Sequence, residues 1–117
     1  MKFFKNKEFN CKCKKCNEHH MNMEILEMLE TARVFAGIPF KINSAWRCEE
    51  HNKKVGGTPT SSHLLGKAVD IGAKTPRERF WVVYGLINAG FTRIGIGKNF
   101  VHADTDHNKD AEVVWLY

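Results

Sequence analysis

The chain has 117 residues, of which 43% are hydrophobic and 26% are charged; this is enough for one domain with a buried core and too short for a second. Eighteen Lys and Arg residues against 13 Asp and Glu residues give a formal net charge of +5. The composition excludes a disordered tail, and no apolar run reaches the roughly 20 residues that a bilayer crossing needs, so no membrane insertion is expected. The basic balance favours an acidic partner, such as nucleic acid, an anionic membrane surface or bacterial wall polymer.

The first 21 residues differ from the rest of the chain. They mix lysine, aromatic residues, cysteine and histidine with neither helical nor strand periodicity, so we expect an irregular arm laid on a single domain of residues 1–117. The stretch "MKFFKNKEF" has lysines but lacks the apolar segment and cleavage site of a secretory signal peptide. The expected location is therefore the cytoplasm in which the protein is made, and another agent must release it if it acts outside.

The next segment predicts a helix, a strand and a helical turn. Apolar residues at helical spacing begin after Asn22 and stop at Gly37 and Pro39, which end the helix. Residues 40–46 alternate as a strand does, and residues 48–54 are expected to form a short helical turn.

The second half predicts a short buried strand at 68–73 and a helix with Thr75 as N-cap, Pro76 at its first position and Gly90 at its end. Residues 92–106 are typical of a hairpin that turns near 97–99, and residues 112–117 of a final strand. These elements predict an α+β fold in which helices pack on one face of a small, mostly antiparallel sheet. The tryptophans fall on apolar faces and are expected in the core: Trp46, Trp81 and Trp115.

Two separated fragments, "SSHLLGKAVD" and "FVHADTD", carry candidate metal ligands. Strand alternation points His102 and Asp104 to the same face. In the earlier fragment, Gly66 allows a tight turn between His63 and a strand that carries Asp70. A single histidine is more often structural, but two histidines and a carboxylate form a three-ligand set with a fourth position open, the pattern of catalytic zinc.

The segment "SAWRCEEHNKKVGGTPTSSHLLGKAVDI", followed by "GIGKNFVHADTD" and "WLY", resembles the M15 family of zinc D-Ala-D-Ala carboxypeptidases and peptidoglycan endopeptidases. The family pattern of S-x-H, then G-x-A-x-D, then a later strand histidine is met by Ser61, His63, Gly66, Ala68, Asp70 and His102. The resemblance implies the fold shared with the Hedgehog signalling domain, a small sheet that carries zinc on one face with helices on the other.

The resemblance also implies roles for individual residues. His63, Asp70 and His102 would bind Zn²⁺, Arg47 would stabilise the substrate carbonyl oxygen, and Ser61 would help to hold the peptide. The implied reaction is hydrolysis of an amide in a peptidoglycan stem peptide, with zinc-bound water as the nucleophile. Both carboxypeptidase and endopeptidase action stay open, as does the bond: D-Ala-D-Ala, L-Ala-D-Glu or a cross-bridge. A monomeric, phage-associated enzyme that acts on the bacterial cell wall is the expected setting.

One position departs from the family pattern. Several relatives carry Glu or Asp as general base three residues before the last zinc histidine, and here that position is Asn99, which cannot accept a proton at neutral pH. Asp104 is the best substitute as general base because it shares a face with His102. The alternative role for Asp104 is to orient His102 by a hydrogen bond.

The four cysteines allow a second metal site. Three cysteines of the arm, completed by a fourth ligand, could form a structural tetrahedral zinc site. A disulfide to Cys48 and free thiols are the alternatives. The candidate ligands are Cys11, Cys13, Cys16 and Cys48, with His19 or His20 as replacements for Cys48.

Two other functions remain as alternatives. Lysines interleaved with Phe3, Phe4 and Phe9 could make the arm a nucleic-acid-binding module, which we regard as the less favoured function. A domain that has kept the fold and zinc but lost catalysis could serve as a wall-recognition module. Asn99 supports this second alternative, and the presence of Arg47 and Ser61 argues against it.

Overall fold

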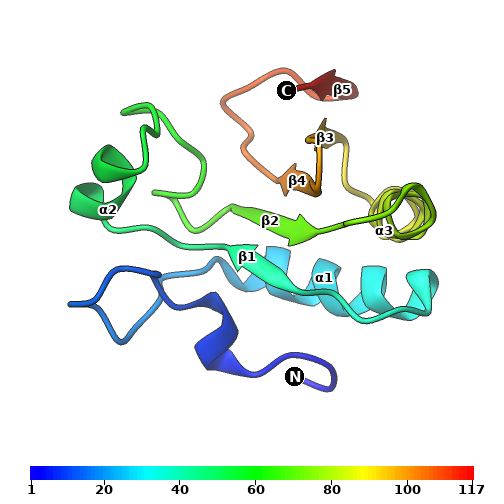
Figure 1. Cartoon of the computed structure of the whole chain (residues 1–117), viewed down its shortest axis with the longest axis horizontal. Coiled ribbons are helices and arrows are strands. Elements are labelled where there is room, and N and C mark those ends of the chain that lie inside the picture. Colours follow the sequence, from blue (N-terminus) through cyan, green and yellow to red (C-terminus); the bar gives the residue numbers. More distant parts are fainter.

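The computed structural model describes all residues 1–117 as a five-stranded sheet with three α-helices and one short 3-10 turn (Figure 1). The helices are α1 (Met23–Ala36), α2 (Glu49–Lys54) and α3 (Pro76–Asn88), and the turn η1 is Asn6–Phe9. The strands are β1 (Ile42–Ser44), β2 (Ala68–Gly72), β3 (Arg93–Ile96), β4 (Phe100–Asp104) and β5 (Val113–Leu116). None of the helices combines the length and the apolar composition that a membrane crossing requires.

The two long helices begin and end where the sequence predicts. The Asn22 side chain accepts the Glu24 backbone N–H at 2.9 Å at the start of α1, and Gly37 ends that helix in the left-handed conformation. The Thr75 hydroxyl accepts the Glu78 backbone N–H at 3.1 Å at the start of α3. These side-chain caps satisfy amide groups that the first turn of a helix leaves without a partner.

The sheet is mixed, whereas the sequence predicted a mostly antiparallel sheet. Its order is β1-β2-β4-β3-β5, in which β5 pairs with β3 in parallel and the other neighbours pair antiparallel. Both sides of β4 are already occupied by β2 and β3, so β5 cannot form a hairpin with the strand that precedes it. The chain instead crosses β3 through residues 105–112 and runs alongside its far edge.

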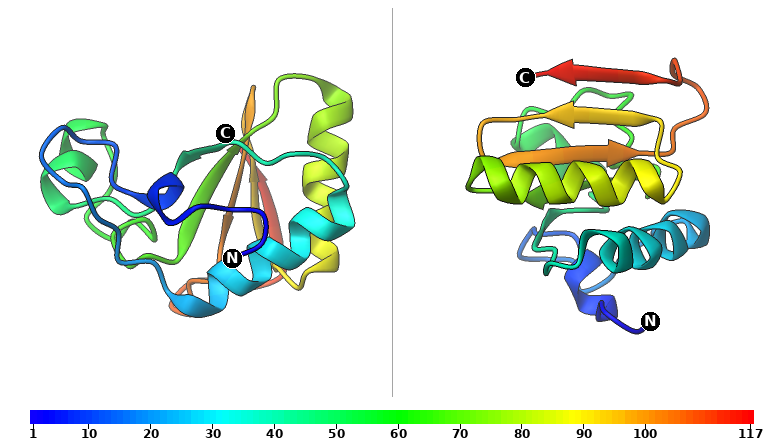
Figure 2. Two further views of the ribbon diagram at one scale, coloured as in Figure 1. Left: turned by 90° about the horizontal axis from the view of Figure 1, so that it is seen from below. Right: turned by 90° about the vertical axis from the view of Figure 1, so that its right-hand side faces the viewer.

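Strand alternation separates a hydrophobic face of the sheet from a polar one. α1 and α3 cover one face, and α2 with the loop that follows it lies on the other side (Figure 2). Val69 and Val101 are fully buried beneath the helices, whereas their strand neighbours Asp70 and His102 project to the opposite face. Phe4 and Phe9 of the N-terminal arm are buried in the same core as the helices.

The tryptophans are not part of the core, contrary to the expectation from sequence. Trp81 is 37% exposed on α3, where its ring packs at 5.0 Å from Phe80 and 5.4 Å from Tyr84. Trp46 and Trp115 are half-buried. Trp81 lies on an outward face of α3 together with its apolar neighbours Phe80 and Tyr84. Trp115 lies on the polar face of the sheet, where its ring is 5.5 Å from the His102 ring.

Replacement of Gly66 by alanine is expected to lower the free energy of unfolding by at least about 2 kcal/mol. Gly66 has φ +68, and an added Cβ would overlap the carbonyl oxygen of His20. The Gly66 carbonyl also accepts the Asn22 N–H at 2.8 Å, so neither segment can move away freely. Urea denaturation measures the loss.

Gly56→Ala is the matched control for that substitution. Gly56 has φ +79 but no atom within 4 Å of an added Cβ, so it isolates the conformational cost of about 1–2 kcal/mol. Equal losses for the two variants would contradict the tight packing of the arm against the Gly66 turn.

Candidate metal centre

Three side chains from different segments converge on the polar face of the sheet. Asp70 lies on β2, His102 lies opposite it on β4, and His63 comes from the loop between α2 and β2. The Asp70 carboxylate lies 3.4 Å from His63 Nε2 and 2.9 Å from His102 Nδ1. Both histidines are buried. The structure thus brings together the three residues in which the sequence predicts metal ligands.

The spacing of these donors fits a divalent metal ion. Tetrahedral Zn²⁺ with bonds of about 2.0–2.1 Å to nitrogen and oxygen separates its ligand atoms by about 3.3 Å. One donor atom from each of the three residues can be chosen so that all lie within 4.8 Å of one another. Two imidazole nitrogens and one carboxylate oxygen are also the donor types that Zn²⁺ prefers in catalytic sites. The residues present therefore fit a zinc ion that leaves one coordination position free.

Backbone contacts fix the His63 ring. Its Nδ1–H donates to the Ala45 carbonyl oxygen at 2.7 Å, which leaves the lone pair of Nε2 directed toward Asp70. A hydrogen bond of this kind selects the tautomer and the ring orientation that a metal ligand needs. The Arg47 backbone N–H donates to the His63 carbonyl at 3.2 Å, so His63 is held through both its ring and its backbone.

His102 lies between two carboxylates. Its Nδ1 is 2.9 Å from Asp70 and its Nε2 is 2.7 Å from Asp104. Burial alone would lower the pKa of His102, but the hydrogen bonds to Asp104 and Asp70 outweigh it and raise the pKa. Burial likewise acts to raise the pKa of Asp70, and the hydrogen bonds from the two histidines instead bring it below its ordinary value. A metal ion can take the place of the protons between these groups, because ligands bind in their deprotonated forms.

Both carboxylate oxygens of Asp104 form hydrogen bonds to other groups of the protein. One oxygen contacts His102 Nε2, and the other accepts Arg93 Nε at 2.7 Å and the Asp106 N–H at 3.1 Å. The residue is 2% exposed. Burial alone would raise the pKa of Asp104, but these hydrogen bonds lower it. A buried carboxylate with a lowered pKa is a poor proton acceptor, so the geometry favours the orienting role over the role of general base.

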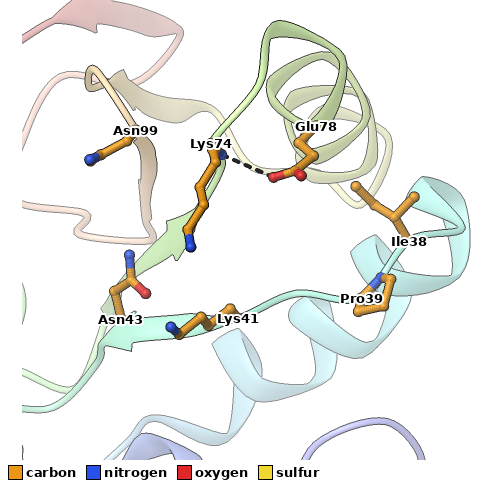
Figure 3. Close-up of a pocket in the computed structure, with 8 residues that line it drawn as sticks. Ile38, Pro39, Lys41, Asn43, Lys74, Glu78 and Asn99 are labelled. Carbon is orange, nitrogen blue, oxygen red and sulfur yellow. Dashed lines mark hydrogen bonds between the residues drawn. The ribbon is translucent and has the colours of Figure 1, made fainter.

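Asn99 lies outside this centre. It sits in the turn between β3 and β4, where its carbonyl accepts the Ala73 N–H at 2.9 Å. Its side chain lines a separate cavity of about 570 Å³ between β1 and the start of α3, with Lys41 and Lys74 (Figure 3). None of His63, Asp70 and His102 lines that cavity. Position 99 therefore supplies this centre with neither a carboxylate nor an amide group.

Arg47 is held beside the centre with one nitrogen left to face it. Its Nε donates to the Ser44 hydroxyl and its Nη1 to the Asn52 Oδ1, both at 3.2 Å. Its Nη2 lies 3.7 Å from the Asp70 carboxylate. β1 ends at Ser44, earlier than the predicted strand of residues 40–46, and the chain then turns to place Arg47.

An open cavity of about 390 Å³ lies over the three residues. Ser61 lines it and accepts the His63 N–H on its hydroxyl at 3.3 Å. Lys109 also lines it, and its Nζ donates to the Thr60 carbonyl at 2.9 Å and lies 3.5 Å from the Asp106 carboxylate. A cavity with this lining can admit a small anionic or carbonyl-containing substrate.

Four residues beside this centre were not predicted from the sequence to lie there. They are Asn52, Arg93, Trp115 and Tyr117. The sequence contained a partial signal for two of them, because Arg93 lies in the expected strand "TRIGIG" and Trp115 in the expected strand "EVVWLY". The Arg93 guanidinium stacks over the Trp115 ring at 4.9 Å, a contact between strands whose parallel pairing the sequence did not predict.

A sheet that presents two histidines and a carboxylate beneath a fixed arginine defines a candidate metal-dependent hydrolase. In a comparison with profiles of protein families, residues 2–104 match the family Peptidase M15. The chain therefore belongs to the M15 peptidase family, as the resemblance indicated, and the family supports metallopeptidase activity. A search among curated proteins found no match.

Proposed function

We propose that the protein is a zinc peptidase that hydrolyses an amide bond in a peptidoglycan stem peptide. The observation that supports this most is the convergence of His63, Asp70 and His102 on an open cavity in a chain of the M15 peptidase family. Such a substrate is short and rich in carboxylates, which suits the net charge of +5 and a site of action at the bacterial cell wall.

His63, Asp70 and His102 would hold the Zn²⁺ ion. When bound there, the ion would supply a Lewis acid that polarises the scissile carbonyl and lowers the pKa of a water molecule toward 7. The contact of His63 with Ala45 and that of His102 with Asp104 hold the two rings in place before the metal arrives.

Arg47 would stabilise the negative charge that develops on the carbonyl oxygen during attack. Ser44 and Asn52 fix its guanidinium group, so little reorganisation is needed when that charge appears. Lys109 would attract the carboxylates of the stem peptide, and Ser61 would accept or donate a hydrogen bond to its backbone. These contacts orient the amide bond over the centre.

Two of the three aromatic residues that could serve a nucleic-acid-binding arm are unavailable for base stacking. Phe4 is 5% exposed and Phe9 is fully buried. The Arg33 guanidinium lies over the ring of Phe3 at 4.7 Å, which covers one face of the third. The arm therefore offers nucleic acid its lysine charges but few stacking surfaces, and the peptidase function is the better supported of the two.

The experiment that tests the proposed function is digestion of purified peptidoglycan by the zinc-loaded protein, with the products identified by mass spectrometry. Release of free D-alanine would indicate a carboxypeptidase, and release of larger peptide fragments an endopeptidase. Binding to the wall material without any cleavage would overturn the proposed peptidase function and favour a wall-recognition module.

Replacement of Asp104 by asparagine is expected to reduce kcat/KM by about 10- to 100-fold, the usual effect of losing the partner that orients a metal-bound histidine. The asparagine amide can turn its NH₂ group to His102 Nε2 and so favour the tautomer that protonates Nδ1. The shape of the pH–rate profile should be retained, because Asp104 orients and does not take up the proton. Loss of the acidic limb of that profile would instead identify Asp104 as the general base.

A further inference from the structure

Four cysteine thiols gather at a place separate from the His63 centre, since none of them lines the cavity over that centre. Cys11, Cys13 and Cys16 follow the η1 turn in the N-terminal arm, and Cys48 precedes α2. The four sulfur atoms all lie within 4.8 Å of one another, although Cys48 comes far later in the chain than the three cysteines of the arm. We propose that these four thiols form a structural zinc site that fastens the arm to the segment carrying Arg47.

The distances match a metal tetrahedron better than disulfides. With Zn–S bonds of about 2.3 Å, two sulfur ligands of a tetrahedral zinc ion lie about 3.8 Å apart. The Sγ atoms of Cys11 and Cys48 are 3.7 Å apart, whereas a disulfide bond is about 2.0 Å long. The four atoms also form one group rather than two separate pairs.

The backbone around the sulfurs is arranged as it is around bound thiolates. The Cys48 N–H points to Cys11 Sγ at 3.4 Å, the His51 N–H to Cys48 Sγ at 3.4 Å, and the Cys16 N–H to Cys13 Sγ at 3.2 Å. Amide groups directed at sulfur stabilise the negative charge that a thiolate keeps when it binds a metal. Three of the four sulfurs therefore already have an N–H donor.

The loop that carries these thiols has little else to hold it. Residues 12–18 contain three exposed lysines and no buried side chain, and the loop closes through one backbone hydrogen bond from Cys11 N–H to the Glu18 carbonyl at 3.1 Å. Ordering such a segment is entropically unfavourable without a compensating interaction. A metal ion bound by Cys13 and Cys16 supplies that interaction.

The surrounding charge suits the same ligand. Four thiolates around one Zn²⁺ ion leave two negative charges in excess. Four lysines line the small cavity beside the cluster: Lys12, Lys14, Lys15 and Lys54. Lys15 also pairs with Glu50 of α2 at 3.1 Å and so adds a second link between the arm and the helix. The His19 and His20 alternatives are not needed, because Cys48 completes the set.

The position of the site gives it a consequence for the catalytic face. Cys48 is the residue after Arg47 and caps α2, which carries the Arg47 partner Asn52. A metal ion on Cys48 would hold both partners of that contact in place. The zinc site proposed for the thiols thus supports the guanidinium without contacting the substrate itself.

The test is the zinc content of the protein purified under reducing conditions, measured by inductively coupled plasma mass spectrometry. A His63→Ala/His102→Ala double variant removes the ligands of the other centre and leaves all four cysteines, so its expected content is about one zinc per chain. The wild type should hold about two, and a Cys13→Ser/Cys16→Ser variant about one. Far-ultraviolet circular dichroism checks that each variant is folded.

Cobalt substitution of the His63→Ala/His102→Ala variant identifies the ligands without any activity measurement. Bound Co²⁺ should show sulfur-to-cobalt charge-transfer bands and the intense visible bands of tetrahedral geometry. A metal-free double variant whose four thiols alkylate freely, or whose intact mass shows two disulfides, would overturn the proposal. Iron at the same stoichiometry would overturn the assignment of zinc. None of these results would affect the proposed peptidase function, which rests on the centre of His63, Asp70 and His102.

Discussion

Replacement of His63 by alanine is expected to lower kcat/KM for stem-peptide hydrolysis by more than about 100-fold. Loss of a partner that merely orients a ligand costs up to about that factor, and His63 would be a ligand itself. The ring is buried and held at Nδ1 by Ala45, so no neighbouring side chain can replace its Nε2 beside Asp70. The initial rate on peptidoglycan and the bound zinc, measured on the same sample, should fall together.

His107→Ala is the matched control for His63→Ala. His107 is exposed and forms no hydrogen bond through its ring, so this variant should keep both its zinc and its rate. A His63→Ala variant that hydrolysed the substrate at the wild-type rate would show that His63 is not a ligand of the catalytic metal, whatever the effect of the substitution on stability.

Replacement of Arg47 by alanine is expected to lower kcat by about 10²- to 10³-fold while the zinc content stays unchanged. The guanidinium contributes when charge develops on the carbonyl oxygen, so KM should change less than kcat. Arg47 is not a metal ligand; its Nη2 lies 3.7 Å from the Asp70 carboxylate. Its loss should therefore leave the three ligands and their zinc in place. Steady-state kinetics on a synthetic stem peptide separate the two constants.

Two further variants sharpen the Arg47 experiment. Arg47→Lys keeps the charge but loses the fork held by Ser44 and Asn52, so it should recover only part of the lost kcat. Arg77→Ala, at an exposed position on α3, removes the same charge away from the cavity and should leave kcat unchanged. A rise in KM at constant kcat for Arg47→Ala would instead show that the residue only binds the substrate.

The three candidate ligands could be predicted because the fragments "SSHLLGKAVD" and "FVHADTD" match the pattern of the M15 family. The direct pairing of Asp70 with His102 could not be predicted from local rules, because it joins β2 to β4, two strands that the sequence did not pair. The helices were predictable from local rules, since their caps are encoded by adjacent residues such as Asn22 and Thr75.

The remainder of the centre depends on tertiary contacts that adjacent residues do not encode. The role of Asp104 was ambiguous because sequence gives its face but not the Arg93 contact that occupies its second oxygen. The parallel placement of β5 follows from the occupied edges of β4, which no local pattern records. Trp115 was assigned to the core for the same reason, although its strand brings it over His102.

Removal and return of zinc tests the central claim most directly. The wild-type protein is treated with a chelator, and hydrolysis of a stem peptide is followed as Zn²⁺ is titrated back, with His63→Ala treated in parallel. A catalytic zinc held by His63, Asp70 and His102 predicts that the chelated wild type is inactive and regains its rate, while His63→Ala does not. A chelated wild type that keeps its rate, or a His63→Ala variant that regains it, would contradict a metallopeptidase centred on these residues.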